Sequence, residues 1–427
     1  MLTPPASAVA LVVTLGALAA SLGGCPPEES VTIPNSTDPT NKSARYVGAS
    51  ACRNCHSDVG EWTALHAHSH TLTAVRGAAP SFPEGTSAGV GAPPEGLAWA
   101  DISYVLDGFT TGARYLDQRG FILTTGSTGG AAQWDVAQPA LGNAAGLVDY
   151  AADVAAPIAY DFDRLRGETT GAVAQDPENP ESQENRPGIE GTWNEPGVQC
   201  EACHGPGSGH FNSRFGQVSI DLSRIYVDLD GGDSCRACHT QPYGDQTGVI
   251  AARDGYIEHR AQWPELRASG GHRNFTCTTC HDPHRSTTYD RANAIRNECT
   301  ACHTDQNMAG HRGFVFSRPD GYTETLSCES CHMPYAALKA TTGTPEAFGD
   351  AARVGDTRSH IFRISADPAG AASMFTADGS QVLRDADGRA AVTVDFVCLR
   401  CHNGNGIFEL RLDRAAEIAP RLHDFPE

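Results

Sequence analysis

The chain has 427 residues and a formal net charge of −20, which argues against nucleic acid as a partner. Aromatic residues make up only 7% of it, while glycine and proline number 45 and 26. A core built from side chains alone would be thin for this length, so we expect another component to fill the interior.

The N-terminus carries a short apolar run, Ala8–Leu22, that is followed by Gly-Gly-Cys. The run has the size of an export-signal core and is too short to span a bilayer comfortably. A small pair before a cysteine resembles the lipobox of bacterial lipoproteins, so residues 1–25 are predicted to be a signal peptide with Cys25 as the lipidated residue. The absence of Lys and Arg before the run, and Pro26 after the cysteine, leave plain secretion and a buried apolar helix open.

Residues 26–45 are rich in Pro, Ser and Thr and are predicted to form a flexible tether. Either export interpretation places the mature chain outside the cytoplasm. With the lipid, it would be anchored at the periplasmic or outer-membrane surface of a bacterium, and without the lipid it would be periplasmic. Proline rather than aspartate after the cysteine favours the outer membrane, by the sorting rule that this resemblance implies.

Seven Cys-x-x-Cys-His motifs contain every cysteine except Cys25. The cysteine pairs are Cys52 and Cys55, Cys200 and Cys203, Cys235 and Cys238, Cys277 and Cys280, Cys299 and Cys302, Cys328 and Cys331, and Cys398 and Cys401. The histidines that follow them are His56, His204, His239, His281, His303, His332 and His402. In haem c two cysteine sulfurs form thioether bonds with the porphyrin, and the adjacent histidine ligates the iron from the proximal side. We therefore expect seven covalently attached haems c.

Other uses of these motifs fit less well. Disulfides do not require a histidine after each pair, and zinc sites rarely place one beside every second cysteine. A redox Cys-x-x-Cys needs a single copy. Five motifs fall between residues 200 and 332, so their haems must lie close together, as electron transfer along a chain requires.

Ten histidines lie outside the motifs and are candidates for the distal position on each iron. Six stand singly in or near the haem-rich part: His210, His259, His272, His284, His311 and His360. The cluster at 66–70 can supply a seventh, with His66 preferred to His68. His423 is expected to have no special role, and Met333 directly follows His332 and cannot reach the opposite face of that iron. The haems are therefore predicted to be mostly bis-histidine, low-spin and low in potential.

His210 follows the second motif by a short Gly-Pro-Gly-Ser-Gly linker. The linker keeps it near the proximal side of the haem attached at Cys200 and Cys203. It is therefore expected to reach a neighbouring haem.

Several of these motifs sit in longer patterns: "YVGASACRNCHSDVGEW", "GTWNEPGVQCEACHGPGSGH", "CTTCHDPH", "CESCHMP" and "DFVCLRCHNGNG". With them the sequence resembles the multihaem cytochrome c proteins related to cytochrome c-554, over residues 46 to about 406. The resemblance implies stacked pairs of bis-histidine haems that carry electrons. Some octahaem relatives are reductases or oxidases of nitrogen or sulfur compounds.

One departure from that pattern lies at residues 160–171, "YDFDRLRGETTG". Relatives often have another haem motif here, whereas this chain has Phe162 and Leu165 in place of cysteines and Arg166 in place of the histidine. An eight-haem ancestor that lost one site would explain the segment, and coincidence is the alternative. A loss would leave the first haem poorly connected unless the fold closes the gap.

The predicted fold is mainly α with extensive irregular structure, organised around seven covalent haems. We expect a one-haem module with a haem-free insert (46–198), a five-haem block (199–340) and a one-haem module (341–427). Small β-hairpins are predicted at 113–126, in the insert, and at 380–396, in the C-terminal module, with Asp-Gly at the turn of the second.

The favoured function is an exported electron carrier in which no haem binds substrate. A multihaem reductase or oxidase with one open iron is the first alternative, although no variant motif marks a catalytic haem. A subunit of an extracellular cytochrome filament is the second. The acidic balance predicts redox partner proteins with basic docking patches.

Overall fold

The computed structural model describes residues 41, 43–214, 217–228, 232–241, 248–304, 306, 308, 310–405 and 407–424. The predicted signal peptide, Cys25 and nearly all of the predicted tether lie outside these residues. Ile33–Glu427 form one of two units of the chain, and this unit contains all of the described residues. Across the described residues, no helix combines the length and apolar character needed to cross a membrane.

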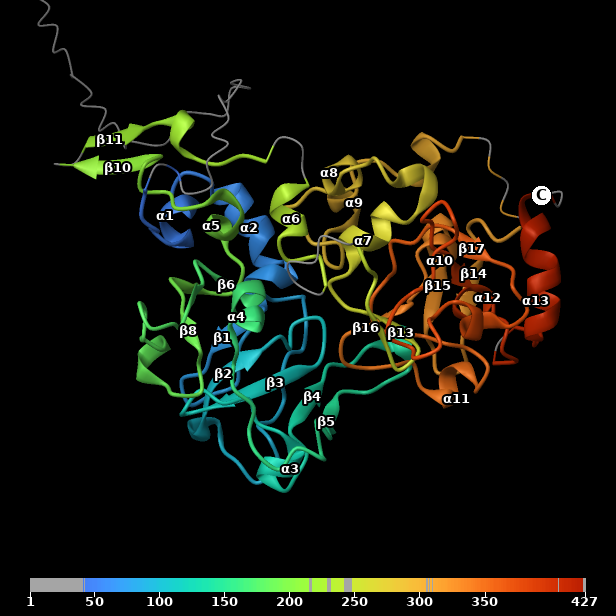
Figure 1. Cartoon of the computed structure of the whole chain (residues 1–427), viewed down its shortest axis with the longest axis horizontal. Coiled ribbons are helices and arrows are strands. Elements are labelled where there is room, and N and C mark those ends of the chain that lie inside the picture. Colours follow the sequence, from blue (N-terminus) through green and yellow to red (C-terminus); the bar gives the residue numbers. More distant parts are fainter. Residues whose placement is uncertain are drawn as a thin grey trace, which may run out of the picture. The chain divides into compact units, whose positions relative to one another are not determined.

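A five-stranded antiparallel sheet forms the centre of the haem-free insert (Figure 1). Its strands, in spatial order, are β1 (Leu72–Ala74), β2 (Ile102–Leu106), β3 (Ala113–Asp117), β4 (Gln133–Asp135) and β5 (Gly146–Val148). The predicted turn after Asp117 is present, since Leu116 bridges Ile122. The prediction of a small hairpin was nevertheless too modest, because β2 and β4 extend it into a sheet with buried residues such as Tyr115 and Ile102.

The insert packs its own apolar core without any other component. Leu116, Ile122, Tyr160, Leu165 and Ile189 are each 0% exposed and belong to one cluster. Burial of this apolar surface holds the sheet against the segment that follows it. The composition of the whole chain predicted a thin core of side chains, and this prediction does not hold for the insert.

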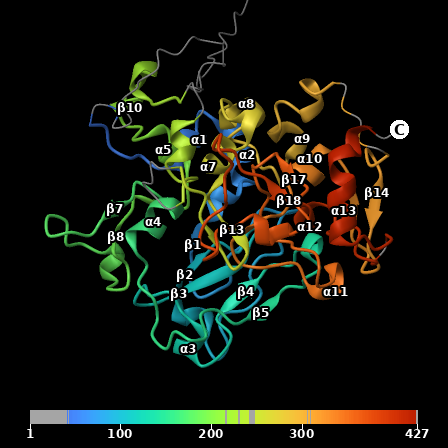
Figure 2. The ribbon, with the colours of Figure 1, turned by 45° about the vertical axis from the view of Figure 1, so that its right-hand side comes forward.

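Helices elsewhere are short. The α-helices are α1 (Ala49–Arg53), α2 (Ser57–Ala64), α3 (Thr125–Thr128), α4 (Phe162–Glu168), α5 (Cys200–His204), α6 (Asp233–Arg236), α7 (Gln262–Arg267), α8 (Cys277–Cys280), α9 (Arg291–Ala294), α10 (Cys328–His332), α11 (Pro345–Phe348), α12 (Val394–Val397) and α13 (Leu412–Ile418). Several of the shortest coincide with the cysteine motifs. Figure 2 shows α10, α12 and α13 together near the C-terminal end.

Small sheets connect the remaining chain. The pairs are β6 (Thr169–Thr170) with β9 (Glu195–Pro196), β7 (Val173–Ala174) with β8 (Gly191–Thr192), β10 (Phe211–Arg214) with β11 (Gln217–Ile220), and β14 (Val315–Ser317) with β15 (Thr323–Thr325). A three-stranded sheet joins β12 (Ala252–Arg253), β13 (Tyr256–Glu258) and β16 (Ala337–Leu338), and β17 (Ile364–Ser365) pairs with β18 (Val392–Thr393).

The hairpin predicted at 380–396 is wrong in its pairing. The turn exists, because the Asp385 N–H donates to the Arg389 carbonyl at 2.9 Å. The strand beyond it, β18, pairs in parallel with β17 instead of returning along the preceding segment. The residues of the turn itself determine the bend, whereas burial of Val392 determines that β18 pairs with β17.

Contacts cross the predicted module boundaries. Lys339 forms an ion pair with Asp107 of the insert at 2.5 Å. The buried Arg318 donates to the carbonyls of Pro139 and Ala140, also in the insert. The boundaries at 198/199 and 340/341 therefore stay predictions about sequence organisation.

Candidate functional site

Each cysteine motif is folded as one helical turn. The histidine N–H donates to the carbonyl of the first cysteine, four residues earlier, as in His56 to Cys52 and His303 to Cys299, both at 2.9 Å. Residues i, i+3 and i+4 of such a turn share one face, so both sulfurs and the imidazole lie on the same side. This is the arrangement that attachment of one haem edge requires.

Six of the seven motif histidines face a second histidine. The pairs are His204 with His284 (6.0 Å between ring centroids), His239 with His68 (5.9 Å), His281 with His360 (6.1 Å), His303 with His272 (5.8 Å), His332 with His423 (5.9 Å) and His402 with His311 (6.2 Å). The spread of these distances is small for contacts made by unrelated segments.

The common distance matches an iron between two imidazoles. A bond of about 2 Å from metal to imidazole nitrogen, plus roughly 1 Å from nitrogen to ring centre, places two trans rings about 6 Å apart. The described residues therefore fit the group that the motifs imply. The residues that fit an iron are pairs of histidines. No group of three or more His, Cys, Asp or Glu among the described residues is arranged to hold a metal ion.

Hydrogen bonds to Nδ1 orient many of these rings. His204 Nδ1 lies 2.8 Å from the Tyr226 carbonyl, and His332 Nδ1 lies 2.8 Å from that of Phe362. His239 uses Gln262 Oε1 in the same way. A proton held on Nδ1 leaves the Nε2 lone pair free for a metal, and this is the usual outer-shell partner of a ligating histidine.

Burial favours the neutral, metal-binding form of several facing imidazoles by lowering their pKa. It lowers the pKa of His360 to about 3 and is also the main cause of the lowered pKa of His239 and His281. For His68 burial, followed by neighbouring His66, lowers the pKa well below its usual value. A charged imidazole could not donate a lone pair to iron.

His66, preferred above, is less suited to ligation than His68. Its Nδ1 accepts the His68 N–H at 3.2 Å, so the proton of the neutral ring lies on Nε2. Nor is His70 suited, because its Nε2 lies 2.8 Å from the Ala64 carbonyl. The structure thus distinguishes three histidines that the sequence presents as equivalents.

Two other predicted distal ligands, His259 and His210, have surroundings that differ from those of the six paired histidines. Among the described residues, no ring contact joins His259 to a motif histidine, and burial followed by Lys339 lowers its pKa well below the usual value. His210 also faces no motif histidine, but its Nδ1 lies 3.0 Å from the Asp221 carbonyl, as in the paired rings. His423, which sequence reasoning set aside, faces His332 with ring planes 13° apart.

The thiols of successive motifs are neighbours, in the order of the sequence. Two junctions are hydrogen-bonded thiols, Cys52 with Cys200 and Cys235 with Cys277. At each of the other four, a neighbouring thiolate raises the pKa of a thiol: Cys238 that of Cys203, Cys302 that of Cys280, Cys328 that of Cys299, and Cys331 that of Cys398. The attachment points therefore form one unbroken series from the first motif to the last.

The second motif contacts the segment that leads into the first motif directly, although the insert separates the two motifs in the sequence. Glu201, inside the second motif and 3% exposed, accepts the N–H groups of Val47 and Gly48 at 3.0 and 2.8 Å. Glu195 accepts the N–H of Ala49, the first residue of α1. The fold thus closes the gap that the segment 160–171 opens in the sequence.

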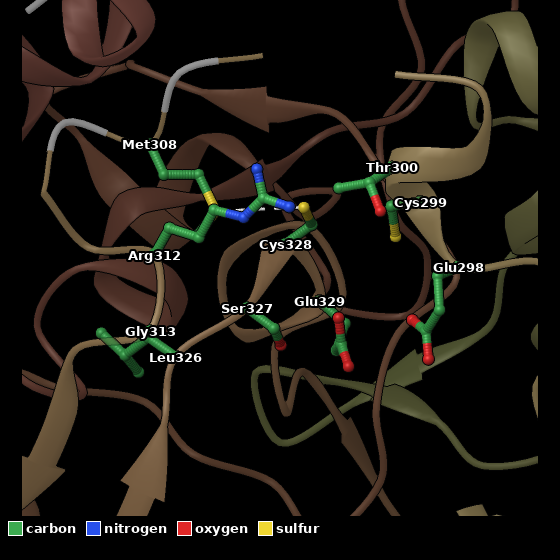
Figure 3. A pocket seen from close by; sticks show the side chains of 10 residues that line it. All are labelled: Glu298, Cys299, Thr300, Met308, Arg312, Gly313, Leu326, Ser327, Cys328 and Glu329. Carbon is green, nitrogen blue, oxygen red and sulfur yellow. Dashed lines mark hydrogen bonds between the residues drawn. The ribbon is translucent and has the colours of Figure 1, made fainter. Parts of the chain in front are cut away.

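A cavity of about 320 Å³ lies between the fifth and sixth motifs (Figure 3). Cys299, Met308, Arg312 and Cys328 are among its lining residues, and the Cys328 thiol is 3.9 Å from the Met308 sulfur. The volume is at the lower end of the range for small-molecule sites, about 300–1,000 Å³. Since Cys299 and Cys328 belong to different motifs, the cavity lies at the junction of two attachment sites.

Aromatic residues left exposed by the polypeptide lie beside the histidine pairs. Phe408 is 68% exposed with its ring 4.6 Å from that of His402, and Phe275 is 38% exposed and contacts His272. An apolar plate bound between the paired rings would cover both phenylalanines.

Cys52 and the twelve motif cysteines from Cys200 to Cys401 are free thiols, as thioether formation requires.

Comparison with known proteins finds two curated relatives, each 25% identical to part of this chain. The chain is 25% identical over 244 residues to the dissimilatory sulfite reductase MccA of Wolinella succinogenes, covering 48% of this chain and 33% of that protein. It is also 25% identical over 148 residues to the multihaem cytochrome MtrA of Shewanella baltica, covering 33% of this chain and 37% of that one. The matched regions thus span about a third of each curated relative. No family model matches.

The solved structure of the octahaem sulfite reductase MccA matches with a TM-score of 0.51 over 91% of this chain and 71% of that one, at 16% identity. At this identity the likeness concerns the fold. A shared fold and sequence similarity to haem-rich proteins thus join the helical cysteine turns and facing imidazoles described above, and together they support a multihaem c-type cytochrome.

Proposed function

We propose that this chain is an exported electron carrier with seven covalent haems c, one at each motif. The observation that carries the proposal is the series of neighbouring motifs, from α1 in contact with α5 at the first two motifs to Cys331 and Cys398 in one apolar cluster at the last two. Electrons pass efficiently only between closely spaced haems, so such a series suits a linear path. When bound, each haem supplies an iron that accepts or releases one electron.

Six of the irons are assigned to the facing histidine pairs. For the iron beside His56 we assign His210 as the distal ligand. Its linker is tied to the residues before the first motif, because the Ser208 N–H donates to the Arg45 carbonyl at 3.0 Å and the Arg45 N–H donates to the Ser208 hydroxyl at 2.7 Å. Its Nδ1 partner also leaves Nε2 free for the metal.

Intact-mass analysis of natively matured protein tests the haem count. Seven added haems are expected, and six would indicate that one motif is unused. Carbon monoxide binding to the reduced protein tests ligation, and the carrier function predicts almost none. A mass lacking the haems, or stoichiometric binding at several irons, would overturn the proposal.

A reductase or oxidase of a small nitrogen or sulfur compound is the second candidate. The similarity to a sulfite reductase favours it, as does His56, which faces no second imidazole among the described residues. This function needs one iron with an open distal position. One carbon monoxide per chain, retained in a His210→Ala variant, would favour the enzyme over the carrier.

Membrane attachment through a lipid on Cys25 belongs to the same proposal. It would hold the carrier at the periplasmic or outer-membrane surface. Fractionation of cells that express Cys25→Ser tests it, with release from the membrane fraction expected. Retention of the variant in the membrane would contradict a lipid anchor at this residue.

A further inference from the structure

A buried ion pair joins the last two cysteine motifs. Arg400 lies between Cys398 and Cys401, and its side chain is 1% exposed. Its Nη1 and Nη2 donate to the two carboxylate oxygens of Glu324 at 2.7 and 2.9 Å. This two-bond geometry between a guanidinium and a carboxylate is the strongest form of the contact and the most specific in direction.

The same carboxylate also contacts the sixth motif. Glu324, in β15, accepts the hydroxyl of Ser330 at 2.9 Å, and Ser330 lies between Cys328 and Cys331. The Tyr322 hydroxyl donates to it as well, at 3.1 Å. One side chain therefore contacts both attachment turns, and each contact is made to the residue just before the second cysteine.

A second guanidinium completes the cluster. Arg358 lies 3.7 Å from Glu324, and its Nη1 donates to the carbonyls of Glu329 and Met333, both at 2.9 Å. These carbonyls belong to the sixth motif and to the residue after it. The cluster thus holds two positive charges and one negative charge, with Glu324 and Arg400 shielded from water.

These charges lie where two haems would meet. Cys331 and Cys398 pack against the same apolar cluster, and α10 contacts α12, so the two attachment points lie close together. Charges interact more strongly in a buried setting than in water. Nearby charge, hydrogen bonding and burial are the means by which a protein sets haem potential.

We propose that Glu324 and Arg400 form a positioning clamp that holds the sixth and seventh haems together and sets their reduction potentials through opposed buried charges. Positive charge stabilises the reduced haem, which carries one more electron, and negative charge destabilises it. The paired charges therefore partly cancel at both irons, and removal of either one unbalances the other. This inference rests on the proposed electron-carrier function and adds the residues that tune its final step.

The test is a spectroelectrochemical titration of the full-length haem-loaded protein. Glu324→Gln removes the negative charge and is expected to raise the potentials of two of the haem components. Arg400→Gln removes the positive charge and is expected to lower the same two. Glu417→Gln is the matched control, because it makes the same substitution at a carboxylate that is 68% exposed, and no component should shift.

Shifts of opposite sign in the two variants support the clamp, since loss of structure alone would not reverse sign. Shifts of the same sign, or none beyond the control, overturn it. If Arg400→Gln fails to mature, Arg400→Lys keeps the charge without the planar fork, and potentials close to the wild type are then required alongside the upward shift in Glu324→Gln. The haem mass of each variant separates failure of the clamp from failure of the carrier proposal.

Discussion

At the residue scale, the hydrogen bond at Nδ1 distinguishes several candidate metal ligands from His66. Nδ1 of His204 and of His332 lies 2.8 Å from a backbone carbonyl, which leaves Nε2 available to a metal. His66 accepts at Nδ1 and so carries its proton on Nε2. The three histidines of the 66–70 cluster differ in chemistry for this reason, although they are four residues apart at most.

We expect His423→Ala to convert one haem from low spin to high spin without loss of haem mass. Its ring lies 5.9 Å from that of His332 and nearly parallel to it, so removal opens one distal position. Electron paramagnetic resonance and carbon monoxide titration report this as about one open iron per chain. His66→Ala serves as the control and should remain low-spin; an identical response in both variants would contradict the assignment.

At the element scale, α4 lies in the segment 160–171, where the family resemblance implies a haem motif. Phe162 and Leu165, three residues apart on one helical turn, pack into the insert core instead of presenting sulfurs. Arg166 donates to the carbonyl of Ala237 in the third motif. The helix geometry is that of an attachment turn, which fits the hypothesis of a lost haem whose place was taken by side chains.

Leu165→Ala should destabilise the insert by about 2–5 kcal/mol, because this side chain is 0% exposed and its loss leaves a cavity. Urea denaturation followed by far-ultraviolet circular dichroism measures the change. Val173→Ala, at a residue that is 48% exposed, is the control, with an expected effect of about 0.5 kcal/mol or less. Equal effects would mean that α4 is not part of the core.

We expect the free energy of unfolding to fall at low pH because Glu324, in β15, becomes protonated. Burial alone would raise the pKa of this carboxyl, but the Arg400 guanidinium outweighs burial and lowers the pKa from its usual 4.5 to about 2. The stabilisation is therefore complete above about pH 4.5 and is lost as the pH falls towards 2. At about 1.4 kcal/mol per pKa unit, the loss amounts to about 3 kcal/mol.

Urea midpoints measured between pH 6 and pH 3 check this expectation. The wild type should lose stability more steeply over that interval than Glu324→Gln, which has no carboxyl to protonate at this position. Parallel pH profiles for the two proteins would show that the ion pair contributes nothing to acid sensitivity.

At the scale of the whole molecule, a path of neighbouring motifs coexists with a formal net charge of −20. Haem propionates would make the charge more negative still. A partner that docks by charge should then present basic residues, as the sequence predicts.

Association with a basic redox partner should therefore slow as salt is added, because salt screens exposed charges. Stopped-flow electron transfer between 10 and 500 mM salt measures this, with an expected decrease of roughly 10-fold or more in the second-order rate constant. An uncharged small-molecule reductant is the control and should show little salt dependence. A rate with the protein partner that is independent of salt would contradict electrostatic docking.

Much of the candidate site could be predicted from the sequence, because haem attachment is local chemistry. Two sulfurs and an imidazole within one helical turn are specified by five consecutive residues, so the Cys-x-x-Cys-His motifs indicate the cofactor directly. His284, His272, His311 and His360 were predicted as distal candidates because they stand singly among the motifs. The turn after Asp117 was likewise set by neighbouring residues.

Only the tertiary structure decided which residues from distant segments meet. It joined His332 to His423 and the first motif to the second across the insert, it left His259 without a facing motif histidine among the described residues, and it paired β18 with β17 rather than in a hairpin. The physical reason is that contacts between distant segments follow from burial and packing of the whole chain, whereas covalent spacing and hydrogen bonds within one turn are determined by adjacent residues alone.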